Sequence, residues 1–143
     1  MSAFIGNLCL EVMVDANGHT LYNRSGRALF MVMQPFAYQS DVIAAYQKCP
    51  IGDDKSSIHI EIGFITDLAS QPQATLSLFG EIGQRPSVPH DHAYSTGEIP
   101  RSVADAMLQE AMILDGDPWW KVKAFFAGVR LFGASHYGTQ YNQ

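Results

Sequence analysis

The stretch Ser57-Ile58-His59-Ile60-Glu61-Ile62-Gly63-Phe64-Ile65 has an apolar side chain at almost every second position. Alternation of this kind puts the isoleucines and the phenylalanine on one face of an extended segment, and the histidine and glutamate on the other. The pattern therefore predicts a half-buried strand. The end of this strand delivers Thr66 and Asp67, which carry a hydroxyl and a carboxylate.

The sequence before this strand is also rich in β-forming residues. Residues 5–14 alternate loosely, residues 15–18 (DANG) are a turn signal, and extended character resumes at Leu21, so a hairpin is predicted. A second apolar run covers residues 27–34, and Pro35 restricts it to an edge or an end of a sheet. Together these segments predict a small antiparallel sheet.

Two helices are predicted near the end of the chain. Residues 101–115 are dense in strong helix formers, and the segment Ser102-Val103-Ala104-Asp105 has the spacing of a capping box. Asp117, followed by a proline, begins the second helix, whose apolar residues recur at helical spacing until Gly133. Because the connection is short, we expect the two helices to pack antiparallel and to lie on the β part through an aromatic face.

The fold class that these elements predict is α+β, with a small antiparallel β-sheet in the N-terminal two thirds packed against a C-terminal two-helix hairpin. The length suits one domain, residues 1–143, which we divide into a strand-rich part (1–99), a helical hairpin (100–133) and a polar tail (134–143). Residues 41–48 fit a helical turn as well as a strand, and their structure stays open.

Composition excludes several classes of function. The formal net charge is -5 and the chain has no basic run that would neutralise several phosphates, so we expect no direct nucleic-acid ligand. Its longest apolar stretches, such as residues 28–33, are far shorter than the roughly 20 residues of a membrane span. The first ten residues lack the pattern of a signal peptide. We expect Cys9 and Cys49 to be small buried apolar residues.

Two polar clusters interrupt the apolar sequence: GFITDLASQP (63–72) and HDHAY (90–94). Followed by a helix with an early aspartate and by a second helix ending in VRLFG (129–133), they resemble the DUF1353 family of uncharacterised proteins of bacteriophages and prophages. The resemblance covers roughly residues 29–133. It implies that the marked positions of the family are Asp67, Ser70, Pro72, His90, Asp91, Tyr94 and Asp105.

The residue types of this cluster allow two kinds of chemistry. His90, Asp91, Asp67 and Ser70 are candidate catalytic residues, with His90 as a base. Ser70 lacks the sequence of a nucleophile elbow. A metal site is the other possibility, and its candidate ligands are His90, His92, Asp67 and Asp105. We expect no cofactor.

A structural role is the simpler interpretation of the same residues. Asp67 fits a turn in which its carboxylate accepts backbone N–H groups, Asp105 fits the acidic position of the capping box, and Tyr94 fits a packed ring. His90 would then join Asp67 or Asp105 in a buried hydrogen-bond network. Such a network would lock the β part to the two C-terminal helices.

Two functional hypotheses follow. The first is a virion-associated structural or assembly protein of a phage tail, baseplate or neck, made in the host cytoplasm and held in an oligomeric assembly with other phage structural proteins. Trp119 and Trp120 are adjacent on a helix, so at least one is expected at an interface. The alternative is a small phage hydrolase, directed at the cell wall and with or without a metal. We expect the chain not to be an enzyme, and the phage context rests on the resemblance alone.

Overall fold

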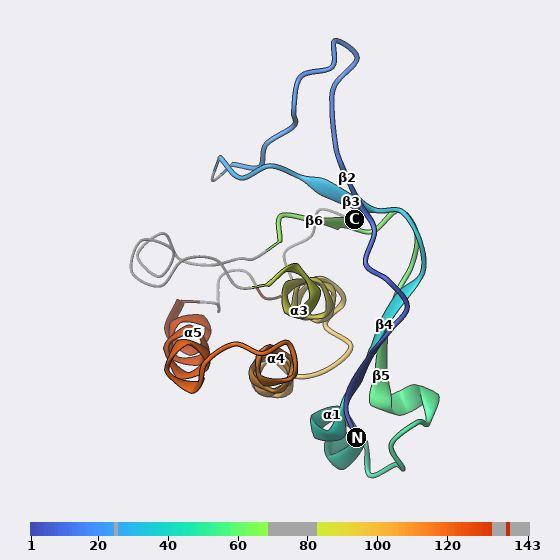
Figure 1. Cartoon of the computed structure of the whole chain (residues 1–143), viewed down its shortest axis with the longest axis vertical. Helices are drawn as coiled ribbons and strands as arrows, with labels where there is room; N and C mark the ends of the chain where they lie inside the picture. The colour runs from blue at the N-terminus through green and yellow to red at the C-terminus, as the bar shows by residue number, and fades with distance from the viewer. Residues whose placement is uncertain (25, 69–82, 133–136, 138–143) are drawn as a thin grey trace.

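A computed structural model of the chain describes residues 1–24, 26–68, 83–132 and 137. Two small antiparallel sheets and four α-helices make this part of the chain a mixed α+β fold, as predicted (Figure 1). In chain order the elements are β1 (Ala3–Ile5), β2 (Leu10–Val12), β3 (Phe30–Val32), β4 (Phe36–Gln39), α1 (Asp41–Gln47), the 3-10 helix η1 (Asp54–Ser56), β5 (Ser57–Ile60), β6 (Ile65–Thr66), α3 (Gln84–Thr96), α4 (Arg101–Leu114) and α5 (Trp119–Phe132).

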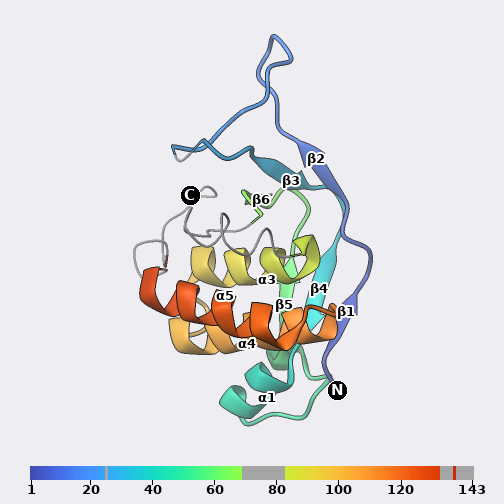
Figure 2. The same cartoon turned by 60° about the vertical axis from the view of Figure 1, so that its left-hand side comes forward.

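The strands form two sheets rather than the one that was predicted. The first has the order β1-β4-β5, and the second has the order β2-β3-β6. The predicted turn is confirmed, because Val14 pairs with Thr20 and the Gly18 N–H donates to the Asp15 carbonyl at 3.0 Å. The predicted strand over residues 5–14 is interrupted, since Gly6 has a positive φ of 81° and ends β1. Beyond β2, this hairpin extends away from the helices (Figure 2).

The alternating stretch is a strand for only part of its predicted length. Ile58 and Ile60 are buried in β5, as expected. The chain then turns at Gly63, which has a φ of 93°, so Ile62 lies in the turn and is 61% exposed instead of buried. Phe64 returns to the core, and β6 follows and delivers Thr66 and Asp67, both buried.

The two predicted helices are present as α4 and α5, within a few residues of the expected bounds. The capping box is wrong. Pro100 occupies the N-cap of α4 without a side-chain hydrogen bond, and Asp105 lies a turn further on, with no exposed surface. Residues 41–48, for which the sequence favoured neither helix nor strand, contain helix α1. Ser40 caps this helix, and its hydroxyl oxygen accepts the Ile43 N–H at 3.1 Å.

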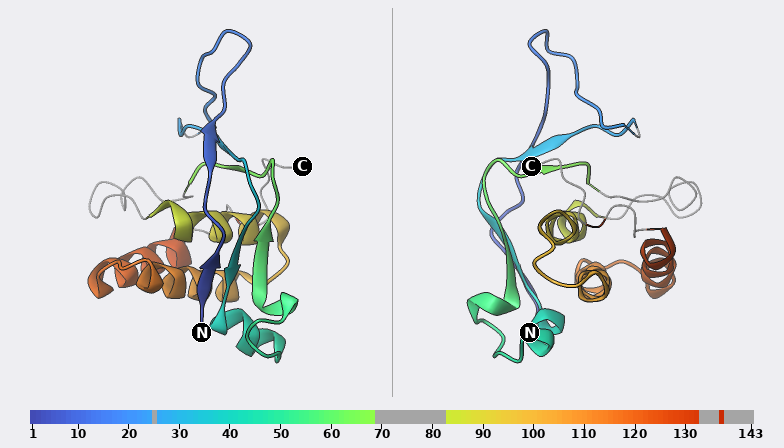
Figure 3. Two further views of the ribbon diagram at one scale, coloured as in Figure 1. Left: turned by 45° about the vertical axis from the view of Figure 1, so that its right-hand side comes forward. Right: turned by 180° about the vertical axis from the view of Figure 1, so that it is seen from behind.

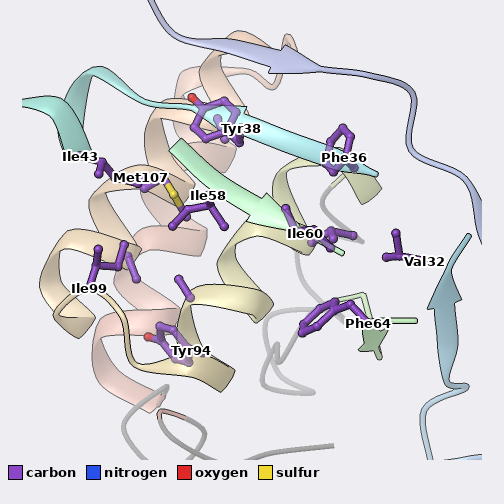
Figure 4. Close-up of a cluster of buried hydrophobic side chains, with 14 residues drawn as sticks. Val32, Phe36, Tyr38, Ile43, Ile58, Ile60, Phe64, Tyr94, Ile99 and Met107 are labelled. Carbon is purple, nitrogen blue, oxygen red and sulfur yellow. The ribbon is translucent and has the colours of Figure 1, made fainter. Parts of the chain in front are cut away.

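Helix α3 was not predicted, and it changes the packing of the molecule. Together with α4 it covers the first sheet, and α5 packs on the side of α4 that faces away from this sheet (Figure 3). The main core between sheet and helices includes Tyr38, Ile58, Ile60, Tyr94 and Met107 (Figure 4). The aromatic face of α5 therefore packs on α4, not on a sheet. This second cluster consists of Leu108, Met112, Val122, Phe125 and Val129.

A buried polar contact fixes α4 to the first sheet. The Glu110 carboxylate accepts hydrogen bonds from the Tyr38 hydroxyl (2.9 Å), the Ser40 hydroxyl (2.7 Å) and the Val42 N–H (3.2 Å). Burial and the neighbouring Glu110 raise the pKa of the Tyr38 hydroxyl, so it remains a donor. These contacts hold α4, and with it Asp105, in a defined position against β4 and the start of α1.

The exposure of the cysteines and tryptophans, and the length of the helices, can be compared with the predictions. Cys9 is exposed and Cys49 is only partly buried, so the prediction that both are buried is wrong. Trp119 and Trp120 are both exposed, at 71% and 49%. In the part of the chain described here, no helix combines the length and the apolar character that crossing a membrane requires.

Candidate active site

Helix α3 carries the HDHAY cluster. Gly83 precedes the helix, Pro86 lies in its first turn, where the missing N–H costs little, and Gly97 ends it with a φ of 65°. Pro89 lies inside the helix. Residues four apart share a helix face, so His90 and Tyr94 point the same way. Asp91 and His92 point in other directions around the helix. The residues of the cluster therefore contact three different sets of partners.

His90 and Asp105 form a buried pair between α3 and α4. The Nε2 atom of His90 lies 3.0 Å from the Oδ1 atom of Asp105, and the Tyr94 hydroxyl donates to the same oxygen at 2.5 Å. The His90 residue is 4% exposed and Asp105 is 0% exposed. The structure therefore pairs an imidazole with a carboxylate, with Asp105 as the partner, but the pair joins α3 to α4 rather than the β part to the two C-terminal helices.

Two arginines complete the surroundings of Asp105. Arg130, in the last turn of α5, donates from Nη1 to Asp105 Oδ2 at 3.0 Å. Arg101 lies 3.8 Å from the same oxygen through its Nε atom, which also donates to the Tyr94 hydroxyl at 3.2 Å. Three helices thus meet at one carboxylate.

The hydrogen bonds to Asp105 determine its charge. Burial alone would raise its pKa, but the hydrogen bonds from His90, Tyr94 and Arg130 lower the pKa below the usual aspartate value. The carboxylate is therefore ionised at neutral pH and accepts hydrogen bonds only. Burial, and the hydrogen bond to Asp105, raise the pKa of Tyr94, which keeps its proton.

The tautomer of His90 follows from this charge. An acceptor at Asp105 requires a proton on Nε2, so a neutral ring carries its lone pair on Nδ1. Among the described residues, none makes a hydrogen bond to Nδ1. Within the described residues, the ring is thus hydrogen-bonded through Nε2 and not through Nδ1. A lone pair held in a fixed direction by a buried carboxylate is the arrangement of a general base.

A second polar pair consists of Asp67 and Asp91, the residue that follows His90 in the chain. Thr66 Oγ1 donates to Asp91 Oδ2 at 2.6 Å, Asn23 Nδ2 donates to Asp67 Oδ2 at 2.9 Å, and Asp67 lies close enough to act on the charge of Asp91. Burial, and next the charge of Asp67, raise the pKa of Asp91 well above its usual value. The raised pKa favours a proton shared by the two carboxyl groups.

This shared proton predicts how stability changes with pH. A carboxyl whose pKa is raised in the folded state stabilises fully below its unfolded pKa, and this contribution is lost as pH rises through the folded pKa. We expect Asp91→Asn, which keeps a donor towards Asp67, to remove that loss and to exceed the wild type by roughly 1–3 kcal/mol at alkaline pH. Urea unfolding from about pH 5 to about pH 9 measures it. A variant that is less stable than the wild type throughout this range would contradict the shared proton.

His92 belongs to neither pair. Its Nδ1 atom lies 3.1 Å from Glu98 Oε1, and its Nε2 atom lies 3.6 Å from Glu61 Oε2. The candidate metal ligands thus divide among three places, since His90 binds Asp105, Asp67 binds Asp91, and His92 faces two glutamates. Within residues 1–24, 26–68, 83–132 and 137, no three His, Cys, Asp or Glu side chains gather as a metal site.

Some of the site lies beyond sequence reasoning or beyond the described residues. Ser70 and Pro72 fall outside the described residues, so their predicted place is untested. Arg101 and Arg130 were missed. Arg130 is 25 residues from Asp105 in sequence, and no local pattern links the two. Only the position of Arg130 within the VRLFG segment marked it.

Comparison with known proteins gives one match. A family model described as "Protein of unknown function (DUF1353)" matches residues 30–129, which is more than two thirds of the chain. The matched segment runs from β3 into α5 and contains both the His90–Asp105 pair and the Asp67–Asp91 pair. No curated protein and no solved structure matched the chain.

Proposed function

The chain belongs to the DUF1353 family, and on that premise we propose that it is a hydrolase in which His90 acts as a general base. One observation carries the proposal: the buried His90 ring gives Nε2 to the Asp105 carboxylate and leaves Nδ1 without a partner among the described residues. The lone pair of Nδ1 can therefore accept a proton, while Asp105 holds the ring through the other nitrogen.

The pair supplies a complete proton path for hydrolysis. His90 Nδ1 takes a proton from a water molecule while the water oxygen attacks the electrophilic carbon of the substrate. Asp105 stabilises the imidazolium that forms, and remains ionised. When the bond to the leaving group breaks, Nδ1 returns the proton to the leaving oxygen. No described hydroxyl or thiol bonds to Nδ1, so water is the nucleophile in this scheme.

The geometry favours a carboxylic ester as the bond that is cleaved. Glycoside hydrolysis uses two carboxyl groups about 5–9.5 Å apart. The contacts that carry this proposal instead centre on one carboxylate, Asp105, which is engaged by His90 and Arg130. An ester releases an alcohol, a far better leaving group than an amine, and a single imidazole is sufficient to protonate it.

A substrate panel tests this proposal. We expect the purified chain to hydrolyse short-chain aryl esters above the rate of the buffer, with much lower activity on aryl glycosides. Release of the aryl alcohol is measured by absorbance. If no ester in the panel is cleaved faster than in buffer, the proposal fails.

A second candidate is the structural role in a phage virion, in which the chain is one subunit of an assembly. The specific observation that supports it is an exposed apolar cluster where α4 turns into α5. The cluster consists of Ile113, Leu114, Trp119 and Trp120. This candidate requires a stable oligomer in sedimentation velocity, and a strictly monomeric chain would count against it.

A further inference from the structure

The C-terminal end of α5 meets the His90–Asp105 pair directly. Arg101 Nη2 donates to the backbone carbonyls of Val129 (2.5 Å) and Arg130 (2.7 Å), which belong to the last turn of α5. These carbonyls have no partner within the helix and carry the negative end of its dipole. Arg101 therefore fastens α5 to α4. This contact places the Arg130 side chain against Asp105.

The two oxygens of Asp105 have separate partners. Oδ1 receives His90 Nε2 and the Tyr94 hydroxyl, and Oδ2 receives Arg130 Nη1. If Arg130 were removed, Oδ2 would lose its short hydrogen bond to a cation. Arg101 Nε, 3.8 Å from this oxygen, would remain, and the ring of His90 would be the nearest group able to add a further positive charge, because a second proton would turn it into an imidazolium beside the carboxylate. An imidazolium has no lone pair and is not a base.

We propose that Arg130 is a positioning residue of the pair: its guanidinium holds Asp105 Oδ2, balances the buried negative charge, and so keeps the His90 ring singly protonated and basic. The part of this inference in which His90 acts as a base rests on the proposed function. The charge balance itself rests on the contacts alone.

Other titratable and charged groups lie near His90 and also affect the charge of its surroundings. On α3, burial and the charge of Asp67 raise the pKa of Asp91 and so favour its neutral form, and Tyr94 keeps its hydroxyl proton. Asp67 lies beside Asp91, Arg101 is a more distant cation at 3.8 Å from Oδ2, and Tyr137 lies against the Tyr94 ring. The glutamates that face His92 lie on another side of α3. Arg130 is therefore the cation in closest contact with the carboxylate.

The test compares Arg130→Gln with Arg130→Lys and with Lys123→Gln. Lys123 is exposed on the same helix, so its variant removes an equal charge away from the pair. The readout is the ¹⁵N NMR signal of the His90 ring nitrogens, assigned with His90→Gln, since it distinguishes a singly from a doubly protonated ring. In Arg130→Gln we expect the ratio of doubly to singly protonated rings at neutral pH to rise by about tenfold. The other two variants should resemble the wild type.

Each outcome decides something. An unchanged ring signal in a folded Arg130→Gln variant would overturn the inference, even if the wild type cleaves esters. A second ring proton in that variant, together with a wild type inactive on esters, would support the charge balance and refute the proposed function. If Arg130→Gln does not fold, Arg130→Lys carries the test. A doubly protonated ring in the lysine variant, which keeps the charge, would overturn the inference.

Discussion

Replacement of Asp105 by alanine is expected to lower the free energy of unfolding by roughly 3–5 kcal/mol, the usual cost of removing one partner from a buried ion pair. The substitution leaves the His90 Nε2–H, the Tyr94 hydroxyl and the Arg130 guanidinium facing an apolar methyl group. His90 and Tyr94, both on α3, are then buried donors without an acceptor, and Arg130 on α5 loses its carboxylate partner. Urea unfolding followed by circular dichroism measures the loss.

The control for this prediction is Asp54→Ala. The Asp54 side chain is almost fully exposed, at 99%, so its removal should change stability by no more than about 0.5 kcal/mol. The pKa of Asp105 is lowered in the folded state, so its contribution is present above the unfolded pKa and disappears as pH falls through the folded pKa. The difference between wild type and Asp105→Ala should shrink on acidification. A cost below about 1 kcal/mol at neutral pH would contradict the buried network.

Local patterns were sufficient for the elements whose sequence periodicity matches their surroundings. The alternation at Ile58 and Ile60 predicts a buried strand, and the DANG sequence at residues 15–18 predicts a hairpin turn. Helices α4 and α5 follow from helix formers and apolar spacing. The alternation failed at Ile62, because a glycine turn at residue 63 ends the strand before the apolar pattern ends.

Helix α3 could not be predicted in the same way, and it is the element that carries the site. It contains two prolines and a run of polar residues, so neither helix propensity nor apolar spacing marks it. Packing against α4 and the first sheet stabilises it instead, which is a tertiary effect. The sequence alone thus leaves the HDHAY cluster without a secondary structure.

The role of Asp105 shows a related limit. Its spacing from Ser102 fits a capping box, and a local interpretation is satisfied with that. The structure instead pairs Asp105 with His90, 15 residues earlier, and with Arg130, 25 residues later. Partners at such distances are set by how three helices pack. The convergence of a histidine and an aspartate was foreseeable from residue types, whereas the choice between Asp67 and Asp105 was not.

The largest effect on activity is expected for His90→Gln. Removal of a general base costs roughly 10²–10⁴-fold in rate, so kcat/KM for an ester should fall by that factor. Glutamine still offers an N–H to Asp105, so we expect the free energy of unfolding to change by only about 1 kcal/mol. Loss of activity with retained stability separates a catalytic role from a structural one.

His92→Gln is the matched control for this substitution. His92 lies two residues further along α3 and is also buried, but its ring nitrogens face Glu98 and Glu61 rather than Asp105. The same chemical change is therefore made on the same helix, outside the proposed proton path. Its kcat/KM should stay within a few-fold of the wild type.

The most direct test of a His90 base is kcat/KM for one aryl ester, measured in parallel for the wild type, His90→Gln and His92→Gln on samples whose unfolding free energies are also determined. We predict a loss of roughly 10²–10⁴-fold confined to His90→Gln, in a protein that remains folded. Equal activity in the wild type and His90→Gln, or an equal loss in both variants, would contradict the role assigned to His90.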